Sequence, residues 1–130
     1  ISRALQDKMV SVVKEYSPRR LFNDYDVGEA LIFNDLEVFF DSRADLFAQE
    51  NIMADGISLI YLEQVVQGED KTYVDVEELF GRYRFDSVLI LKQRPLYAYL
   101  ISHPDKYKII YEDDSAAFFS VKAYNSSGSD

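Results

Sequence analysis

The chain has 130 residues, enough for one domain that buries roughly two-thirds of its unfolded surface but too few for a second core. Its formal charge of −9 repels phosphate backbones, which argues against nucleic acid as a partner, and the lack of cysteine excludes disulfides and thiolate chemistry. The 48% of apolar residues predicts that most of the chain folds. Residues 124–130 have nothing to bury and are expected to form a disordered tail.

The N-terminal segment is predicted to form an amphipathic helix over residues 2–16, with Ser2 as its N-cap. Ser17 and Pro18 end this helix, and residues 20–22 read as a short strand. The strand leads into the turn Asn23-Asp24-Tyr25-Asp26, whose polar side chains can bond back to the backbone.

Residues 29–40 allow two interpretations. Asn34 and Asp35 separate two apolar runs, so the segment is either a hairpin across a two-residue turn or a short helix that feeds a strand. In both interpretations Val38, Phe39 and Phe40 have the β-branched and aromatic character of a buried strand.

The rest of the chain alternates helices and strands. Helices are expected over residues 45–65 and 74–83, and over 96–102 after Pro95. Residues 86–91 are almost wholly apolar and read as a strand buried on both faces, while 107–111 and 116–121 read as a closing hairpin. This order predicts a single-domain α/β layered sandwich over residues 18–123. Its sheet is expected to be mixed and mostly parallel, with about five strands and a C-terminal antiparallel hairpin.

Asp41, Arg43 and Asp45 form an acidic cluster directly after the predicted strand at 38–40. Two carboxylates at a strand end could hold Mg²⁺ or Ca²⁺, but Arg43 lies between them and would compete with a metal ion. An arginine fork that binds a carboxylate is a common structural arrangement. We therefore favour a structural network that ties the Asn23-Asp24 turn to this strand end, and we expect no metal.

Asn23, Asp24 and Tyr25 also have two readings. Turn formation and helix capping account for the first two without any ligand. If these residues meet Asp41 and Arg43 in space, the shared pocket could take the hydroxyls of a sugar, with Tyr25 as a stacking platform.

Motifs of stand-alone catalysis are missing from the sequence. It has no Gly-rich phosphate loop, no nucleophile elbow and no metalloprotease helix, so we expect no cofactor. His103 is the only histidine, and its place at a predicted helix end favours a C-terminal cap over a catalytic triad.

Three segments of the sequence resemble a domain found at the C-terminal end of bacterial polytopic membrane proteins related to GT-C type, lipid-sugar-dependent glycosyltransferases. They are an Asn-acid-aromatic turn before a helix, a strand that runs into Asp-x-Arg-x-Asp, and a set of closing strands, at residues 22–31, 38–47, and 83–90 with 108–119. Glu29 and Ser42 stand where that family frequently has glycine.

The resemblance implies a location on the extracytoplasmic face of the cell membrane. The chain begins at Ile1 without an initiator methionine, so we interpret it as part of a longer, multi-pass membrane protein, with residues 1–17 leading from an upstream membrane segment. The resemblance further implies a helix at 28–34 and a catalytic carboxylate in the membrane part rather than here.

We therefore expect a non-catalytic domain that docks on the membrane-embedded portion of its own parent chain, or helps to present a carbohydrate or a lipid-linked sugar to it. One alternative is an Mg²⁺-dependent hydrolase or phosphotransferase that uses Asp41 and Asp45. A second alternative is a protein-interaction module.

Overall fold

The computed structural model describes residues 5–39, 50–62 and 74–122. Within them the chain forms an α/β fold with one mixed sheet of four strands and five helices, in confirmation of the predicted class. The helices are α1 (Asp7–Tyr16), α2 (Gly28–Phe33), α3 (Glu50–Tyr61), α4 (Val76–Tyr83) and α5 (Pro95–Ile101). The strands are β1 (Leu21–Asn23), β2 (Ser87–Leu91), β3 (Tyr107–Glu112) and β4 (Ala116–Val121), and a short 3₁₀ turn, η1 (Tyr25–Val27), precedes α2.

The strand order in the sheet is β1-β2-β4-β3. Only β1 and β2 run parallel, while β4 is antiparallel to both β2 and β3. The prediction of a mostly parallel sheet is therefore wrong, because the closing hairpin inserts β4 directly beside β2. The C-terminal hairpin itself is confirmed, with a bulge between Ile109 and Tyr111.

The predicted fifth strand is not found among the described residues. Residues 36–39 have no regular structure, and Phe40 to Asp45 lie outside the described ranges. The reason is visible at Phe39, whose N–H donates to the side chain of Asn23 at 2.7 Å instead of to a neighbouring strand. Its ring packs against Phe22 and Phe85.

Residues 28–33 form helix α2, so the hairpin interpretation is wrong and the helix of the other interpretation is confirmed, without the strand that it was expected to feed among the described residues. Asn34 and Asp35 end the helix instead of turning a hairpin. Asp35 adopts a left-handed conformation with φ of 64°, and the N–H of Leu36 donates back to the carbonyl of Leu31 at 2.9 Å.

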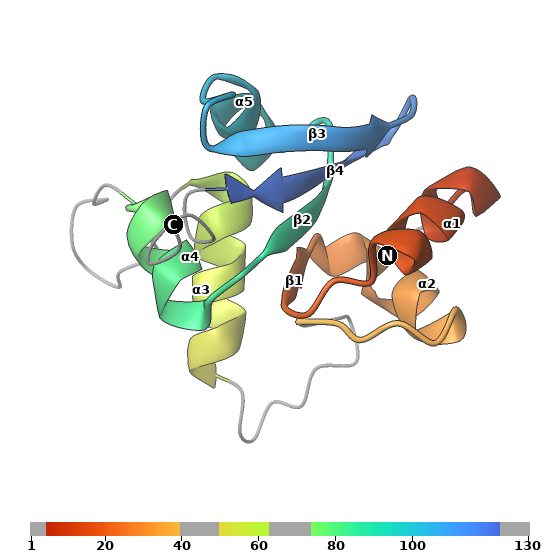
Figure 1. The fold of residues 1–130 in the computed structure, drawn as a ribbon. Coiled ribbons are helices and arrows are strands. Elements are labelled where there is room, and N and C mark those ends of the chain that lie inside the picture. The colour runs from red at the N-terminus through yellow and green to blue at the C-terminus, as the bar shows by residue number, and fades with distance from the viewer. Residues whose placement is uncertain (1–4, 40–49, 63–73, 123–130) are drawn as a thin grey trace.

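Helices cover both faces of the sheet. Phe22, Val88, Ile90 and Phe119 face a core shared with α3, α4 and α5, whereas Leu89, Leu91 and Phe118 face a smaller core under α1 and α2. Figure 1 shows α3 and α4 on one side of β2 and α1 and α2 on the other. All five residues of β2 are buried, as predicted for the strand at 86–91. The fold is thus a three-layer sandwich.

Candidate functional site

The candidate site lies where the parallel strands β1 and β2 end. Asp24 follows β1 directly, and Arg94 follows β2 by three residues. Carboxyl ends of neighbouring parallel strands meet at one edge of a sheet, and this edge is where α/β proteins commonly place ligands. Asp24 and Arg94 therefore come together although 70 residues separate them in sequence.

Arg94 binds two carboxylates at once. Its Nε donates to Asp24 Oδ2 at 2.8 Å, and its Nη2 donates to Asp24 Oδ1 at 3.1 Å and to Asp26 Oδ2 at 2.8 Å. The remaining Nη1 donates to the hydroxyl of Tyr61 at 3.1 Å, and the guanidinium lies 5.4 Å from the centre of that ring. Bidentate arginine–carboxylate contacts of this kind are among the stronger hydrogen bonds in proteins.

This cluster is largely withdrawn from solvent. The side chain of Asp24 is 0% exposed and that of Arg94 is 11% exposed, while Asp26 retains 26%. Hydrogen bonding to Asp24 raises the pKa of Arg94 further above its ordinary value. Arg94 therefore stays charged across the working pH range, and it supplies a full cation to the buried carboxylate.

Backbone groups complete the environment of Asp24. Its Oδ1 accepts from the N–H of Asp26 at 3.0 Å, and its Oδ2 accepts from the N–H of Leu91 at 3.2 Å. Its own N–H donates to the carbonyl of Leu89 at 2.7 Å. With two backbone donors and two guanidinium donors, both carboxylate oxygens are saturated.

Asn23 links the same turn to the segment before Asp41. Its Oδ1 accepts from the N–H of Phe39, and its Nδ2 donates to the carbonyl of Asp24 at 2.8 Å. The capping role predicted for Asp24 is thus present at the start of η1, while the side chain of Asn23 ties the turn to Phe39. Tyr25 is half-buried and packs against the core shared with α3, α4 and α5.

The other predicted site residues, Asp41, Arg43 and Asp45, lie outside the described residues. Their meeting with Asn23 and Asp24, and the sugar and metal readings that depend on it, therefore stay predictions. Within the described ranges, the arginine that binds Asp24 is Arg94. No group of three potential metal-binding side chains occurs among the residues that the structure describes.

Sequence reasoning missed Arg94 and Tyr61. One signal was available: Arg94 occupies the N-cap of α5, just before Pro95, and its side chain makes no capping hydrogen bond. Small polar residues are preferred at this position, and the positive end of a helix disfavours a cation. An arginine there indicates a carboxylate partner elsewhere in the fold.

His103 lies at the C-terminal end of α5, as predicted. Its Nδ1 is 2.9 Å from the carbonyl of Tyr99 and 3.0 Å from the hydroxyl of Ser102, and its ring stacks on that of Tyr99. These contacts are those of a cap.

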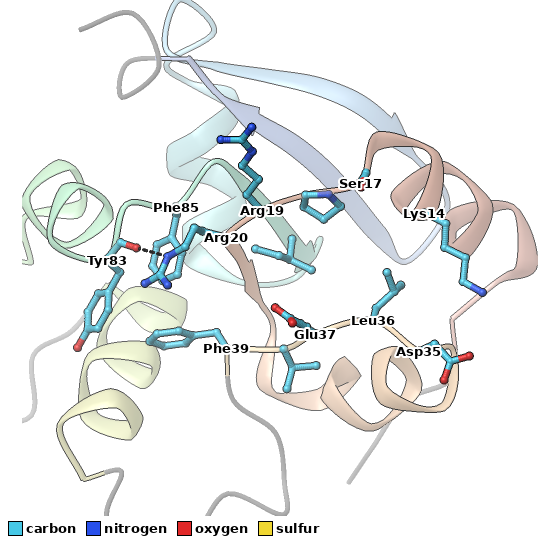
Figure 2. A pocket seen from close by; sticks show the side chains of 13 residues that line it. Lys14, Ser17, Arg19, Arg20, Asp35, Leu36, Glu37, Phe39, Tyr83 and Phe85 are labelled. Atoms are coloured by element: carbon cyan, nitrogen blue, oxygen red, sulfur yellow. Dashed lines mark hydrogen bonds between the residues drawn. The ribbon is translucent and has the colours of Figure 1, made fainter. Parts of the chain in front are cut away.

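A separate groove of about 630 Å³ opens beside β1. Figure 2 shows Arg20 at one end of it, where Nε donates to the carbonyl of Tyr83 at 2.9 Å, and Lys14 at the other. Its described lining does not include Asn23, Asp24 or Tyr25. It therefore differs from the predicted sugar pocket. It is lined by Lys14, Ser17, Pro18, Arg19, Arg20, Leu21, Asp35, Leu36, Glu37, Val38, Phe39, Tyr83 and Phe85.

Comparison of the chain with protein-family models, with curated proteins and with solved structures finds no match. In the described ranges, no helix is both long enough and apolar enough to cross a bilayer.

Proposed function

We propose that this chain is a non-catalytic domain of an integral membrane protein related to GT-C type glycosyltransferases. In this proposal it lies on the extracytoplasmic side, docks on the membrane-embedded part of its parent chain and helps to present a lipid-linked sugar or an acceptor. The support for the membrane context is the resemblance of the turn, the Asp-x-Arg-x-Asp cluster and the closing strands.

The state of Asp24 is the observation that best supports a non-catalytic role. A general base or a metal ligand needs an oxygen lone pair that can reach a substrate or an ion. Asp24 is fully buried, and its oxygens accept four hydrogen bonds from Arg94, Asp26 and Leu91. Recruiting it for chemistry would require breaking contacts that hold β1, β2 and α5 together.

The same contacts show that the turn at Asn23 to Asp26 connects distant parts of the fold. Asn23 holds the backbone at Phe39, and Asp24 holds Arg94 at the start of α5. The turn thus fixes the relative positions of three segments that are distant in sequence. A rigid domain of this kind is suited to docking, because little conformational entropy is lost when a preorganised surface binds.

The experiment is to express the full parent reading frame, separate membranes from cytosol and add protease outside intact spheroplasts. We expect the parent to sediment with the membranes and this domain to be cleaved from outside. A control with permeabilised cells should show cleavage of a cytosolic marker as well.

A parent found in the cytosol would overturn the proposal. The Mg²⁺-dependent alternative would then be tested by thermal unfolding of the chain with millimolar Mg²⁺. Binding to the folded state raises the melting temperature, and Asp41→Asn should abolish the gain if that carboxylate is a ligand.

A further inference from the structure

The end of the sheet opposite to Asp24 carries an open hollow of about 470 Å³. It lies where β2 begins and β4 ends, because Ser87 pairs with Ser120 across these strands. Its lining comes from the last residue of α1, from β3, and from the end of β4 and the residue after it: Tyr16, Lys108, Ile109, Ile110, Ser120 and Lys122.

Two lysines face this hollow without a compensating acid. Lys108 pairs with Ser120 across the two strands, and Lys122 follows Ser120 by two residues, so the lysines are diagonal neighbours on either side of the serine hydroxyl. Among the described residues neither ammonium group has an ion-pair partner, and no carboxylate lines the hollow. Like charges at such positions repel each other unless an anion lies between them.

Asp86 lies next to the hollow, since its carbonyl oxygen is 3.5 Å from the hydroxyl of Tyr16. The N–H groups of Arg19 and Arg20 donate to Asp86 at 2.9 and 3.2 Å, and the carbonyl of Asp86 accepts from the N–H of Val121, directly before Lys122. The carboxylate of Asp86 is already engaged by these two N–H groups and by the hydroxyl of Ser87 at 2.9 Å.

A local excess of cations is notable on a chain whose net charge is −9. The summed field keeps anions away from most of the molecule, so an anionic surface can approach this end more favourably than elsewhere. Tyr16 and Ile110, both half-buried, line the hollow beside the lysines on the face of the sheet that α1 covers. Cations beside half-buried apolar side chains suit the head-group region of a membrane, where both kinds of group are accommodated.

We propose that this hollow is a docking surface for the phosphate groups of an anionic lipid bilayer. Lys108 and Lys122 would donate to phosphate oxygens, with the Ser120 hydroxyl beside them and Ile110 and Tyr16 against the glycerol region. The inference rests on the proposed function, because it requires the domain to lie next to a membrane.

The experiment is co-sedimentation of the chain with vesicles of phosphatidylglycerol mixed with phosphatidylcholine, and with vesicles of phosphatidylcholine alone. We expect binding to the anionic vesicles only, weakening as salt is added. Lys108→Gln with Lys122→Gln should weaken it roughly 25-fold, about fivefold for each lysine near the surface.

The matched control is Lys8→Gln with Lys92→Gln, which removes the same charge from α1 and from the far end of β2. It should bind as the unmodified chain does, and urea unfolding should show that both double variants are folded. Equal weakening by the two double variants, or no binding to anionic vesicles, would overturn the inference. Soluble polyglutamate that binds Lys108 and Lys122 as tightly as the vesicles would overturn the lipid assignment in favour of an acidic peptide.

Fractionation of the parent protein distinguishes an error in the lipid-binding surface from an error in the proposed function. A membrane-bound parent whose domain does not bind vesicles would retain the proposed function and discard this surface. A cytosolic parent would discard the proposed function, whatever the vesicles show.

Discussion

Arg94 lies at a helix position that is locally unfavourable for arginine, and tertiary contacts stabilise it there. As the N-cap of α5 it puts a cation at the positive end of a helix and offers no capping oxygen. The two carboxylates of Asp24 and Asp26 reverse this local disadvantage, since they surround the guanidinium with negative charge. The residue is therefore explained by the tertiary structure alone.

Replacing Asp24 with Asn should lower the free energy of unfolding by roughly 3–5 kcal/mol, because it leaves the guanidinium of Arg94 without its buried partner. Urea denaturation measures this change. Asp26→Asn serves as the control and should cost about 1 kcal/mol or less, since Asp26 is more exposed and makes a single contact with Arg94. Similar losses for the two variants would contradict the central role of Asp24.

At the scale of elements, a polar contact joins α3 to the end of α4. The hydroxyl of Tyr83 donates to Asp55 Oδ2 at 2.5 Å, and Arg82 approaches the same oxygen at 3.3 Å. Burial of the phenol, and then its hydrogen bond to Asp55, raise the pKa of Tyr83 to about 12. Only the neutral phenol can donate this bond, so the contact between the helices depends on pH.

The stability of the chain should therefore fall as pH rises from about 10 towards 12. Below pH 10 the phenol is neutral in both the folded and the unfolded chain, and its favourable interactions are fully present. Above it the unfolded chain loses the proton first, which favours unfolding. Urea unfolding at several pH values measures the slope, and Tyr83→Phe should reduce it. An unchanged slope in that variant would show that other tyrosines, such as the buried Tyr107, carry the effect.

At the scale of the whole molecule, adjacent residues of β4 serve two different cores. Phe118 faces the core under α1 and α2, and Phe119 faces the core shared with α3, α4 and α5. Because a strand points successive side chains to opposite faces, β4 and the wholly buried β2 couple the two cores through one sheet. The described parts of the chain should unfold as a single cooperative unit.

Phe118→Ala and Phe119→Ala should each lower the free energy of unfolding by about 3–5 kcal/mol. In both variants, unfolding followed by circular dichroism and by tyrosine fluorescence should give coincident transitions. Transitions that separate in one variant would show that the two cores unfold independently.

Local features of this chain could be predicted from its sequence, and long-range ones could not. Asp75 accepts from the N–H of Glu78 at the start of α4, Pro95 opens α5, and the apolar run of β2 is buried, all from neighbouring residues. The helix at 28–33 was ambiguous because the left-handed Asp35 is not visible in an apolar pattern.

Strand neighbours and ion-pair partners depended on the fold as a whole. The sequence places Asp41 and Arg43 near Asp24 in number, but the described partner of Asp24 is Arg94, at the end of a parallel strand. The insertion of β4 beside β2 likewise has no local signal, because either edge of the sheet could accept the hairpin. The sequence thus predicted the turn residues Asn23 and Asp24 of the candidate site, but not Arg94, which binds Asp24.

The pairing of β1 with β2 also has a consequence for how the protein is made. β1 obtains its backbone partners from Ser87 to Leu91, and Asp24 obtains its cation from Arg94, all of which are synthesised more than 60 residues later. Until these residues have been synthesised, β1 has no neighbouring strand to pair with, and the carboxylate of Asp24 has no arginine to neutralise it. β1 and Asp24 therefore cannot make their native contacts until the ribosome has delivered β2 and Arg94.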